Sequence, residues 1–282
     1  MDKVTVEKLL AMKGSKRIVV ITAYDYTTAK ICDAADIDVI LVGDSAGMVM
    51  LGYDRTTRVT MDEMLIFCRA VANAKPRAII VADMPFISYQ VSTEEAVYNA
   101  CRFIKEGADA VKLEGGREIL SKVKAIVDAG VPVMGHIGLK PQTALLWQGY
   151  KVHGKNITDA LHIINDASAL QEAGVFSMVL EQVTAETAGI ITRMLKIPTI
   201  GIGSGSACDG QVLVIHDILG LYTAPRFAKR YTNLYESILS AVSAYRDDVV
   251  NGRFPSDEYS FHMTEEEYKT LSLELKRRGV ES

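Results

Sequence analysis

The chain has 282 residues, a length that suits one large α/β barrel or two smaller domains, and 49% of its residues are hydrophobic, enough for a substantial core. Its formal charge is only -4, and acidic and basic residues are mixed throughout the chain. This pattern excludes the electrostatic footprint of a protein that binds nucleic acid or an anionic membrane surface. A small molecule is therefore the expected partner.

The cysteines and the N-terminal residues bear on where the protein works. The four cysteines are widely scattered without C-x-x-C spacing, which argues against a disulfide framework and a structural zinc site: Cys32, Cys68, Cys101 and Cys208. Residues 1–17 are amphipathic and charged, and no apolar run approaches the roughly 18 residues of a membrane span. We expect a cytoplasmic protein with reduced thiols, no export signal and no membrane segment.

Eight apolar runs, mostly β-branched, predict eight strands. In chain order they are 18–22, 39–43, 78–82, 110–113, 131–135, 177–181, 198–202 and 211–215. Helix-length stretches with apolar residues at three- and four-residue spacing lie between most of them, for example 61–75, 93–107 and 158–174. Alternation of strand and helix indicates a parallel sheet. The predicted fold is α/β, a (β/α)8 TIM barrel with a C-terminal helical extension.

Three connections depart from the regular pattern. After Asp44 and after His136 the chain runs long, over 45–60 and 137–155, and long connections at strand carboxyl ends are often functional. We interpret both as candidate lids, and Trp147 in the second could cover a ligand or simply pack. Between Ile202 and Gln211 the gap is too short for a full helix. One barrel unit is therefore degenerate, or a single turn joins the last two strands.

The domain organisation follows from the absence of any linker, shift in composition or internal repeat. We predict one domain over residues 1–282, with 225–282 as a helical tail. The tail pattern predicts a helix over 226–252, a turn at Phe254 and Pro255, and a charged helix over 264–279. Such a tail could pack on its own barrel or on a neighbouring subunit.

Five predicted strands end at or beside a polar residue able to do chemistry. These residues are Asp44, Asp83, Glu114, His136 and Glu181. The carboxyl ends of all strands in a parallel barrel open on one face, so residues far apart in the sequence converge there. The pattern therefore predicts a single shared site and an enzyme.

Asp44 and Asp83 follow neighbouring predicted strands, so their carboxylates would lie side by side. Unpaired they would repel, and a magnesium ion, which usually takes one or two carboxylates plus water and substrate oxygens, would resolve this. Singly, each aspartate could instead cap a helix, with Ser45 capping after Asp44 and Met84 following Asp83. The pair together favours the metal.

Lys112 and Glu114 alternate along one predicted strand, so both should point to the same side. They could serve substrate, or they could form an interior ion pair that only fills volume. His136 could be a satisfied structural histidine, but its place at a strand end favours contact with substrate.

Glu181 ends an apolar strand, and apolar surroundings would raise its pKa, which suits a general base working near neutrality. Its alternative role is a capping carboxylate before the next helix. The glycine-rich run at 201–210 could line a phosphate or another anion, although it is not a P-loop.

At these residues the chain resembles the ketopantoate hydroxymethyltransferase, or 3-methyl-2-oxobutanoate hydroxymethyltransferase, family of the pantothenate pathway. The resemblance covers residues from about 3 to 263 and rests on many motifs in the same order. They are TAYDYTTAK, LVGDSAGM, VTMDEM, ADMPF, VKLEGG, GHIGLKPQ, GYKVHGK, VLE, IGIGSG, DGQVLV, PRFAKRY and GRFP.

The resemblance implies a role for each candidate. Asp44 and Asp83 would hold Mg2+, with Glu114 as a further ligand that could act through water, and Glu181 would be the proton acceptor. The residues implied to contact the keto acid are Asp44, Ser45, Asp83, Lys112 and His136. The family is a cytoplasmic homodecamer of (β/α)8 barrels that uses 5,10-methylenetetrahydrofolate as its one-carbon donor.

The expected reaction moves a hydroxymethyl group to 3-methyl-2-oxobutanoate and gives 2-dehydropantoate. The alternative is another magnesium enzyme acting on 2-oxo acids, of the phosphoenolpyruvate mutase and isocitrate lyase type, but the K-K-C-G-H motif of its lyases does not occur here. A binding protein that has lost its chemistry would lack the base. Related sequences often carry His at the position of Phe67, and Thr and Gln at those of Lys140 and His153, and these departures could alter folate or subunit contacts.

Overall fold

The computed structural model describes residues 2–143 and 151–280. The chain divides into two compact units, residues 1–232 and 233–282. The predicted boundary at residue 225 lies inside the first unit, and the interpretation of the whole chain as one domain stays a prediction.

The first unit is a closed barrel in which each strand pairs in parallel with the next and β8 pairs with β1. The strands are β1 (Ile18–Thr22), β2 (Val39–Val42), β3 (Ile79–Asp83), β4 (Ala110–Glu114), β5 (Val133–Gly138), β6 (Ser177–Glu181), β7 (Thr199–Ile202) and β8 (Gly210–Leu213). The (β/α)8 prediction is confirmed.

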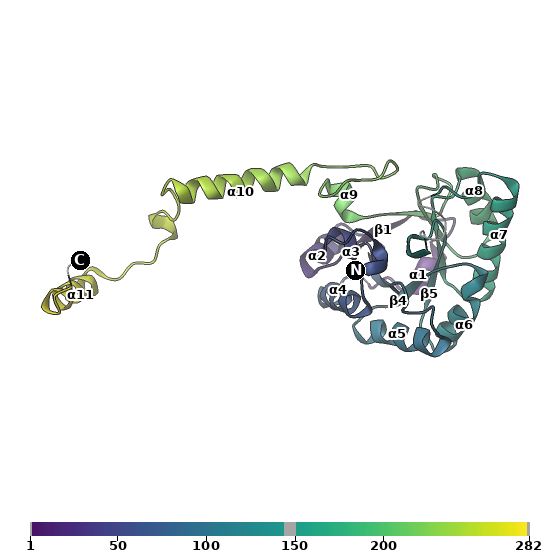
Figure 1. Cartoon of the computed structure of the whole chain (residues 1–282), viewed down its shortest axis with the longest axis horizontal. Helices are drawn as coiled ribbons and strands as arrows, with labels where there is room; N and C mark the ends of the chain where they lie inside the picture. The colour runs from purple at the N-terminus through teal and green to yellow at the C-terminus, as the bar shows by residue number, and fades with distance from the viewer. Residues whose placement is uncertain (1, 144–150, 281–282) are drawn as a thin grey trace. The chain divides into compact units, whose positions relative to one another are not determined.

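Helices alternate with the strands and surround the barrel (Figure 1). They are α1 (Val6–Ala11), α2 (Tyr26–Ala34), α3 (Ala46–Val49), α4 (Met61–Asn73), α5 (Thr93–Lys105), α6 (Leu120–Asp128), α7 (Ile157–Glu172), α8 (Ala185–Met194) and α9 (Ile215–Leu219), with short 3-10 helices η1 (Thr56–Arg58) and η2 (Arg117–Ile119). Their starts are set by the sequence, because Thr60 and Glu63 form a capping box at α4 and Ser92 caps α5.

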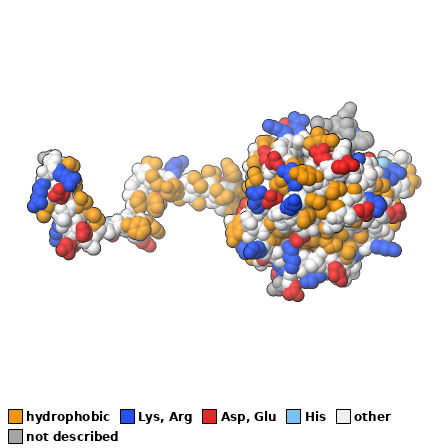
Figure 2. Space-filling model, turned by 90° about the horizontal axis from the view of Figure 1, so that it is seen from below, with side chains coloured by type: hydrophobic (Ala, Val, Ile, Leu, Met, Phe, Trp, Pro, Cys, Tyr) orange, Lys and Arg blue, Asp and Glu red, His pale blue; other side chains and the backbone are white. Residues whose placement is uncertain are grey.

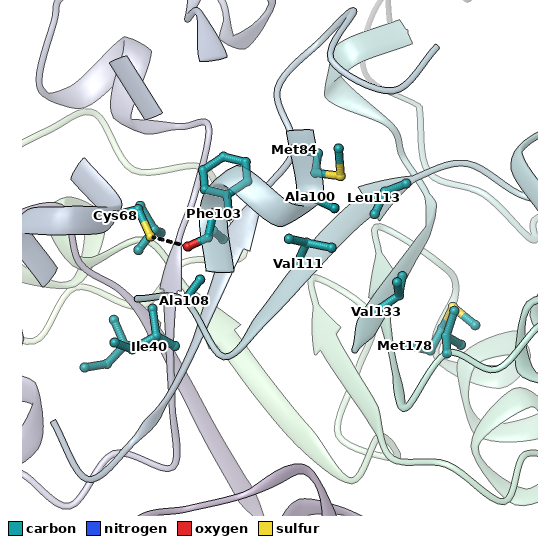
Figure 3. Packing of buried hydrophobic residues seen from close by; sticks show 14 of the residues in the cluster. Ile40, Cys68, Met84, Ala100, Phe103, Ala108, Val111, Leu113, Val133 and Met178 are labelled. Carbon is teal, nitrogen blue, oxygen red and sulfur yellow. Dashed lines mark hydrogen bonds between the residues drawn. The ribbon is translucent and has the colours of Figure 1, made fainter. Parts of the chain in front are cut away.

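Buried side chains form two layers. Along β3, Ile79 and Val81 belong to the cluster inside the barrel, whereas Ile80 and Ala82 belong to the cluster between strands and helices. This alternation is the two-residue period of a strand. Figure 3 shows the outer cluster, in which Phe103 of α5 packs among side chains from the strands and neighbouring helices.

The N-terminal segment closes the amino end of the barrel. Val4 and Leu9 are buried in the interior cluster, and the backbone N–H of Val4 donates to the carbonyl of Arg77. The carboxyl ends of the strands are therefore the end of the barrel at which a site can open.

The irregular connections follow the sequence in part. Residues 203–209 contain no helix, so the degenerate unit between β7 and β8 is confirmed. The connection after Asp44 folds into α3 and η1. Trp147 and part of the second candidate lid lie outside the described residues, so their role stays a prediction.

The second unit contains α10 (Leu234–Val250), the 3-10 helix η4 (Asp257–Tyr259) and α11 (Glu265–Arg277). The prediction that the tail helix begins at residue 226 is wrong. The backbone N–H groups of Tyr231 and Thr232 donate to the carbonyl of Ile218 instead of to a preceding helical turn, so tertiary contacts replace helix there. Among the described residues, no helix is both long and apolar enough to cross a membrane.

Candidate active site

A cavity of about 450 Å³ opens at the carboxyl ends of the strands. All seven residues that the sequence singled out line it: Asp44, Ser45, Asp83, Lys112, Glu114, His136 and Glu181. They come from the ends of β2 to β6 or the residues directly after them, so the closed barrel brings together groups spread over 138 positions, from 44 to 181. The expected convergence on one site is confirmed.

Asp44 and Asp83 are joined through the backbone, because the N–H of Asp44 donates to Oδ2 of Asp83 over 3.0 Å. Both side chains are buried. Ser45 precedes α3, yet its hydroxyl makes no capping bond and lies 2.8 Å from the Tyr24 hydroxyl. These contacts point into the barrel mouth, so the capping alternatives have no support in the geometry.

Lys112 is the cation of the cavity. Its ammonium lies 3.2 Å from Oδ1 of Asp83 and 3.0 Å from Nδ1 of His136. Burial lowers the pKa of Lys112, but the negative charges of Asp83, Glu114 and Asp44 outweigh this effect and raise its pKa above the usual value. Lys112 is therefore a permanent positive charge at neutral pH.

His136 links Lys112 to two carboxylates. Its Nδ1 lies 3.5 Å from Oε1 of Glu114, and its Nε2 lies 3.2 Å from Oε2 of Glu181 without the alignment of a hydrogen bond. Burial and then the charge of Lys112 hold the pKa of His136 well below its usual value, so the ring is neutral. An ammonium can only donate, so Nδ1 accepts and we assign the ring proton to Nε2, facing Glu181.

The carboxyl groups of Asp44, Asp83, Glu114 and Glu181 all resist ionisation, because burial removes their hydration and raises their pKa. Burial raises the pKa of Asp83 to about 7 and that of Asp44 above its usual value, against the opposing charge of Lys112. Burial likewise raises the pKa of Glu181 to about 7, again opposed by Lys112. The expected direction of the Glu181 shift is confirmed.

The rest of the cavity is mostly apolar. Its apolar wall consists of Leu41, Met48, Val49, Leu139, Pro141, Val179, Ile202, Val212, Leu213, Val214, Ala224, Pro225 and Phe227. A cavity with charge at its floor and aliphatic walls suits a small anion that carries a branched apolar group. The segment around Pro225 and Phe227, predicted as helix, instead supplies part of this wall.

Two residues at the site were not identified from the sequence. Gln142 is buried and its side-chain amide donates to Oδ2 of Asp44 over 2.9 Å. Tyr24 is buried beside Ser45, and burial raises its pKa. Each belongs to a motif that carries the family resemblance. Tyr24 lies two residues after β1, as Asp44 lies two residues after β2, but Gln142 lies four residues after β5, so spacing gave no signal for Gln142.

The glycine-rich run does not line this cavity, apart from Ile202. Gly203, Ser204, Gly205 and Ser206 border a separate open depression. The Ser204 hydroxyl donates to the carbonyl of Leu180 and accepts from the N–H of Val183, so it joins the ends of β6 and β7. The suggested anion site stays a prediction.

Phe67, Lys140 and His153 lie away from the carboxylates. Phe67 packs edge-on against Tyr24 at 6.3 Å between ring centroids. Lys140 forms an ion pair with Glu118 at 2.7 Å, and Nδ1 of His153 lies 3.3 Å from Asp159.

The donor set can be tested against magnesium. Within residues 2–143 and 151–280, no three His, Cys, Asp or Glu side chains are arranged as metal ligands. Two carboxylates are enough for magnesium, which completes its shell with water and substrate oxygens. Oδ1 of Asp83 is buried and makes no aligned hydrogen bond among these residues, although the Lys112 ammonium lies 3.2 Å away, and every candidate donor is an oxygen. Asp44 and Asp83 therefore fit the ion.

Comparison with known proteins identifies the family. A family profile described as ketopantoate hydroxymethyltransferase matches residues 3–257. The chain belongs to the ketopantoate hydroxymethyltransferase family. It is therefore a transferase enzyme.

Named relatives agree with this family. The chain is 56% identical to the 3-methyl-2-oxobutanoate hydroxymethyltransferase of Nitrosopumilus maritimus, over 93% of this chain and 95% of that protein. It is 54% identical to the enzyme of the same name from Moorella thermoacetica, over 92% of this chain and 98% of that protein.

Solved structures share the fold at low identity. A phosphoenolpyruvate phosphomutase from Streptomyces platensis subsp. rosaceus matches with a TM-score of 0.61 at 15% identity, covering 98% of each chain. A phosphonopyruvate hydrolase solved with oxalate and Mg++ matches with a TM-score of 0.58 at 15% identity, covering 99% of this chain and 98% of that one. These matches show a common barrel fold.

Proposed function

We propose that the protein transfers a hydroxymethyl group from 5,10-methylenetetrahydrofolate to 3-methyl-2-oxobutanoate in a magnesium-dependent reaction that gives 2-dehydropantoate. The observation that carries the proposal is the juxtaposition of Glu181, Lys112 and the aspartate pair around one small apolar cavity. These are the groups needed to take a proton from carbon and to stabilise the negative charge that results.

The keto acid would bind with its charged end on the cavity floor and its isopropyl group against the aliphatic wall. Lys112 supplies positive charge for the carboxylate and keto oxygens, and Ser45 supplies a hydroxyl held by Tyr24. The neutral ring of His136 places its Nε2 beside the carboxylate of Glu181. The floor is therefore prepared for an anion before the substrate arrives.

Asp44 and Asp83 would hold Mg2+, and Glu114 would act through water. One oxygen of each of the three carboxylates is held by a hydrogen bond, and for Glu114 it is Oε2, which accepts from the backbone N–H of Gln142 at 3.0 Å. When bound, magnesium would polarise the keto group and make the neighbouring C–H more acidic.

Glu181 would take the proton from C3 of the keto acid. Its raised pKa keeps a useful share of the ionised form near neutral pH while making that form a stronger base than an exposed glutamate. The negative charge then spreads to the keto oxygen near Lys112. Water supplies the oxygen of the hydroxymethyl group: as it adds to the methylene carbon, both C–N bonds to the folate break and leave tetrahydrofolate and a one-carbon unit at the oxidation level of formaldehyde. The C3 carbon attacks that unit, a C–C bond forms, and its carbonyl oxygen takes up a proton to become the hydroxyl.

The test is an assay that measures 2-dehydropantoate formed from 3-methyl-2-oxobutanoate and 5,10-methylenetetrahydrofolate, with and without magnesium. We expect product only when both substrates and a divalent cation are present, and chelation should abolish it reversibly. Full activity of chelator-treated enzyme would contradict the metal assignment. Activity on phosphonopyruvate or on a 2-alkylmalate instead would favour the phosphoenolpyruvate mutase and isocitrate lyase alternative.

We also propose that the protein works in the cytoplasm as a homodecamer. Support for the location comes from the four free cysteines, three of them buried. Support for self-association comes from the second unit, in which α10 exposes large apolar side chains and has no buried residue.

A further inference from the structure

We propose that Gln142 is a positioning residue that orients the carboxylates of Asp44 and Glu114 for the metal and substrate. This inference rests on the proposed function, because it assigns those carboxylates to the metal site. Gln142 follows β5 at the end of the described stretch 2–143, and its side chain is buried.

The contacts of Gln142 tie four segments of the barrel mouth together. Its Nε2 donates to Oδ2 of Asp44 and to the carbonyl of Met84, both over 2.9 Å. Its backbone N–H donates to Oε2 of Glu114 over 3.0 Å. Its Oε1 lies 2.9 Å from the Tyr89 hydroxyl. Gln142, in the connection after β5, thus bonds to the segments that follow β2 and β3 and to the end of β4.

The direction of the Gln142 amide is fixed by its neighbours. The carbonyl of Met84 and the carboxylate of Asp44 can only accept hydrogen bonds, so both must face the NH2 end. At the oxygen end, Nε2 of Gln90, which can only donate, lies 3.4 Å from Oε1, and the Tyr89 hydroxyl lies 2.9 Å from Oε1 and 2.9 Å from the carbonyl of Glu114, so its one proton serves either acceptor. A flipped amide would set its oxygen against two acceptors, so the donor at Asp44 is a permanent feature of the fold.

In each of the two aspartates, one carboxylate oxygen is held by a hydrogen bond. Gln142 holds Oδ2 of Asp44, and the backbone of Asp44 holds Oδ2 of Asp83. These two hydrogen bonds leave Oδ1 of each carboxylate outside them, and that of Asp83 lies 3.2 Å from the Lys112 ammonium. Hydrogen bonds of this kind orient metal-binding groups, and their loss costs roughly 10- to 100-fold in metal affinity.

A purely structural role for Gln142 would make a different prediction. Its bonds to Met84 and Tyr89 alone would stabilise the barrel mouth without affecting the metal. Asn99 offers a matched comparison, because its buried side-chain amide donates to the carbonyl of Ser88 over 2.8 Å and contacts none of the carboxylates. Gln142 and Asn99 therefore both have a buried side-chain amide that donates a hydrogen bond to a backbone carbonyl in the connection after β3.

The experiment compares Gln142→Met and Asn99→Leu with the wild-type protein by three measurements. These are the melting temperature, the dissociation constant for Mn2+ from its electron paramagnetic resonance signal, and deuterium exchange at C3 of 3-methyl-2-oxobutanoate as Mg2+ is varied. We expect Gln142→Met to weaken Mn2+ binding about 10-fold or more. Deuterium exchange by this variant should need correspondingly more Mg2+, and its rate should return to that of the wild type at saturating Mg2+. Asn99→Leu should lose stability while binding Mn2+ as the wild type does.

A second variant keeps the inference testable if Gln142→Met does not fold. Tyr89→Phe retains every donor to the carboxylates but removes one of the two groups that bond to Oε1 of Gln142, leaving Nε2 of Gln90 at 3.4 Å, so Mn2+ binding should weaken by less than in Gln142→Met. Unchanged Mn2+ affinity in whichever of these variants folds would overturn the positioning role. Failure of the wild-type protein itself to bind Mn2+ would instead contradict the proposed function.

Discussion

Glu181 differs from an ordinary surface glutamate because burial at the barrel mouth removes the hydration of its carboxylate. Burial raises its pKa to about 7, and Nε2 of His136 lies 3.2 Å from its Oε2. We assign the proton to that nitrogen, so His136 presents N–H polarity to the ionised carboxylate, although the two groups are not aligned as a hydrogen bond. A carboxylate made more basic by burial is what a general base working near neutral pH requires.

Replacement of the proposed base gives the most direct test at this scale. Glu181→Gln keeps the shape of the side chain but cannot accept a proton, so deuterium exchange at C3 of 3-methyl-2-oxobutanoate should fall by at least about 100-fold without folate. Keto acid binding, measured by calorimetry, should persist. Glu118→Gln, at the half-exposed partner of Lys140, is the control and should exchange normally. Exchange at the wild-type rate in Glu181→Gln would move the role of base to another residue, with His136 first.

The pH dependence of this exchange follows from the same pKa. Only ionised Glu181 accepts a proton, so the rate should fall as the pH drops through about 7 and level off above it. Because the folded pKa is raised, the carboxyl holds its proton more tightly in the folded state, and its contribution to stability declines as the pH rises from about 4.5 to 7. An exchange rate that stays constant from pH 5 to 8 would contradict this assignment.

Residue types at strand ends could be predicted from the sequence, but their pairing could not. Asp44, Asp83, Glu114, His136 and Glu181 each follow an apolar run, and parallel strands deliver such residues to one face. The contact of His136 with Glu181 depends on the relative stagger of β5 and β6, where Gly138 pairs with Glu181. Gln142 follows no strand directly, so nothing in its spacing marked it.

At the scale of elements, three aspartates at the amino end of the barrel perform one repeated task. Asp38, Asp109 and Asp209 each precede an even-numbered strand and accept from a backbone N–H of the strand before it. Each also pairs with a lysine of the N-terminal segment: Lys16, Lys3 and Lys13 respectively. Polar residues at this end of a parallel barrel serve stability, whereas those at the other end serve chemistry.

Among these three aspartates, Asp209 should contribute most to stability, because the connection between β7 and β8 in which it lies contains no helix. Its Oδ2 accepts from Lys13 at 2.8 Å, from the N–H of Thr199 at 2.9 Å and from the Thr199 hydroxyl at 3.2 Å. Asp209→Ala leaves the buried Thr199 N–H without an acceptor, while Lys13 and the Thr199 hydroxyl keep their contacts with Thr192, so we expect a loss of about 2 kcal/mol in the free energy of unfolding. Urea denaturation measures it, and exchange at C3 by the folded variant should be normal.

Acid should remove the charged part of this contribution. Burial raises the pKa of Asp209, but hydrogen bonds from Lys13 and Thr199 and the charge of Lys13 lower it below its usual value overall. A carboxyl with a lowered folded pKa adds stability above about pH 4 and loses it as the pH falls further. The difference in melting temperature between wild type and Asp209→Asn should therefore shrink below pH 4. An unchanged difference at pH 3 would contradict the ion-pair contribution.

Element boundaries were predictable where local signals decide them. Thr60 and Ser92 begin α4 and α5 as capping residues, and every predicted strand overlaps an observed one. The prediction of a helix from residue 226 failed because residues 225–232 belong to the barrel unit, in which Tyr231 and Thr232 bond to Ile218. Periodicity cannot show that a distant carbonyl competes for a backbone N–H.

At the scale of the whole molecule, the second unit carries apolar surface that its own residues do not bury. Large side chains recur at helical spacing on one face of α10, and all are exposed: Tyr235, Ile238, Leu239, Val242, Tyr245 and Val249. Figure 2 shows hydrophobic side chains gathered along this segment. Exposed apolar faces of this extent mark sites of association.

The last prediction concerns the face of α10 that carries Ile238 and Val242. If this face mediates the proposed self-association, the double variant Ile238→Asp, Val242→Asp sets charges against an apolar partner surface and should sediment as a smaller species than the wild type. Ser240→Asp, on the opposite side of the helix, is the matched control and should sediment as the wild type does. Deuterium exchange by the double variant should persist, since every residue assigned to the site lies within residues 1–232. A wild-type protein that sediments as a monomer would contradict the homodecamer itself, whereas an unchanged assembly in the double variant would place the interface on another surface.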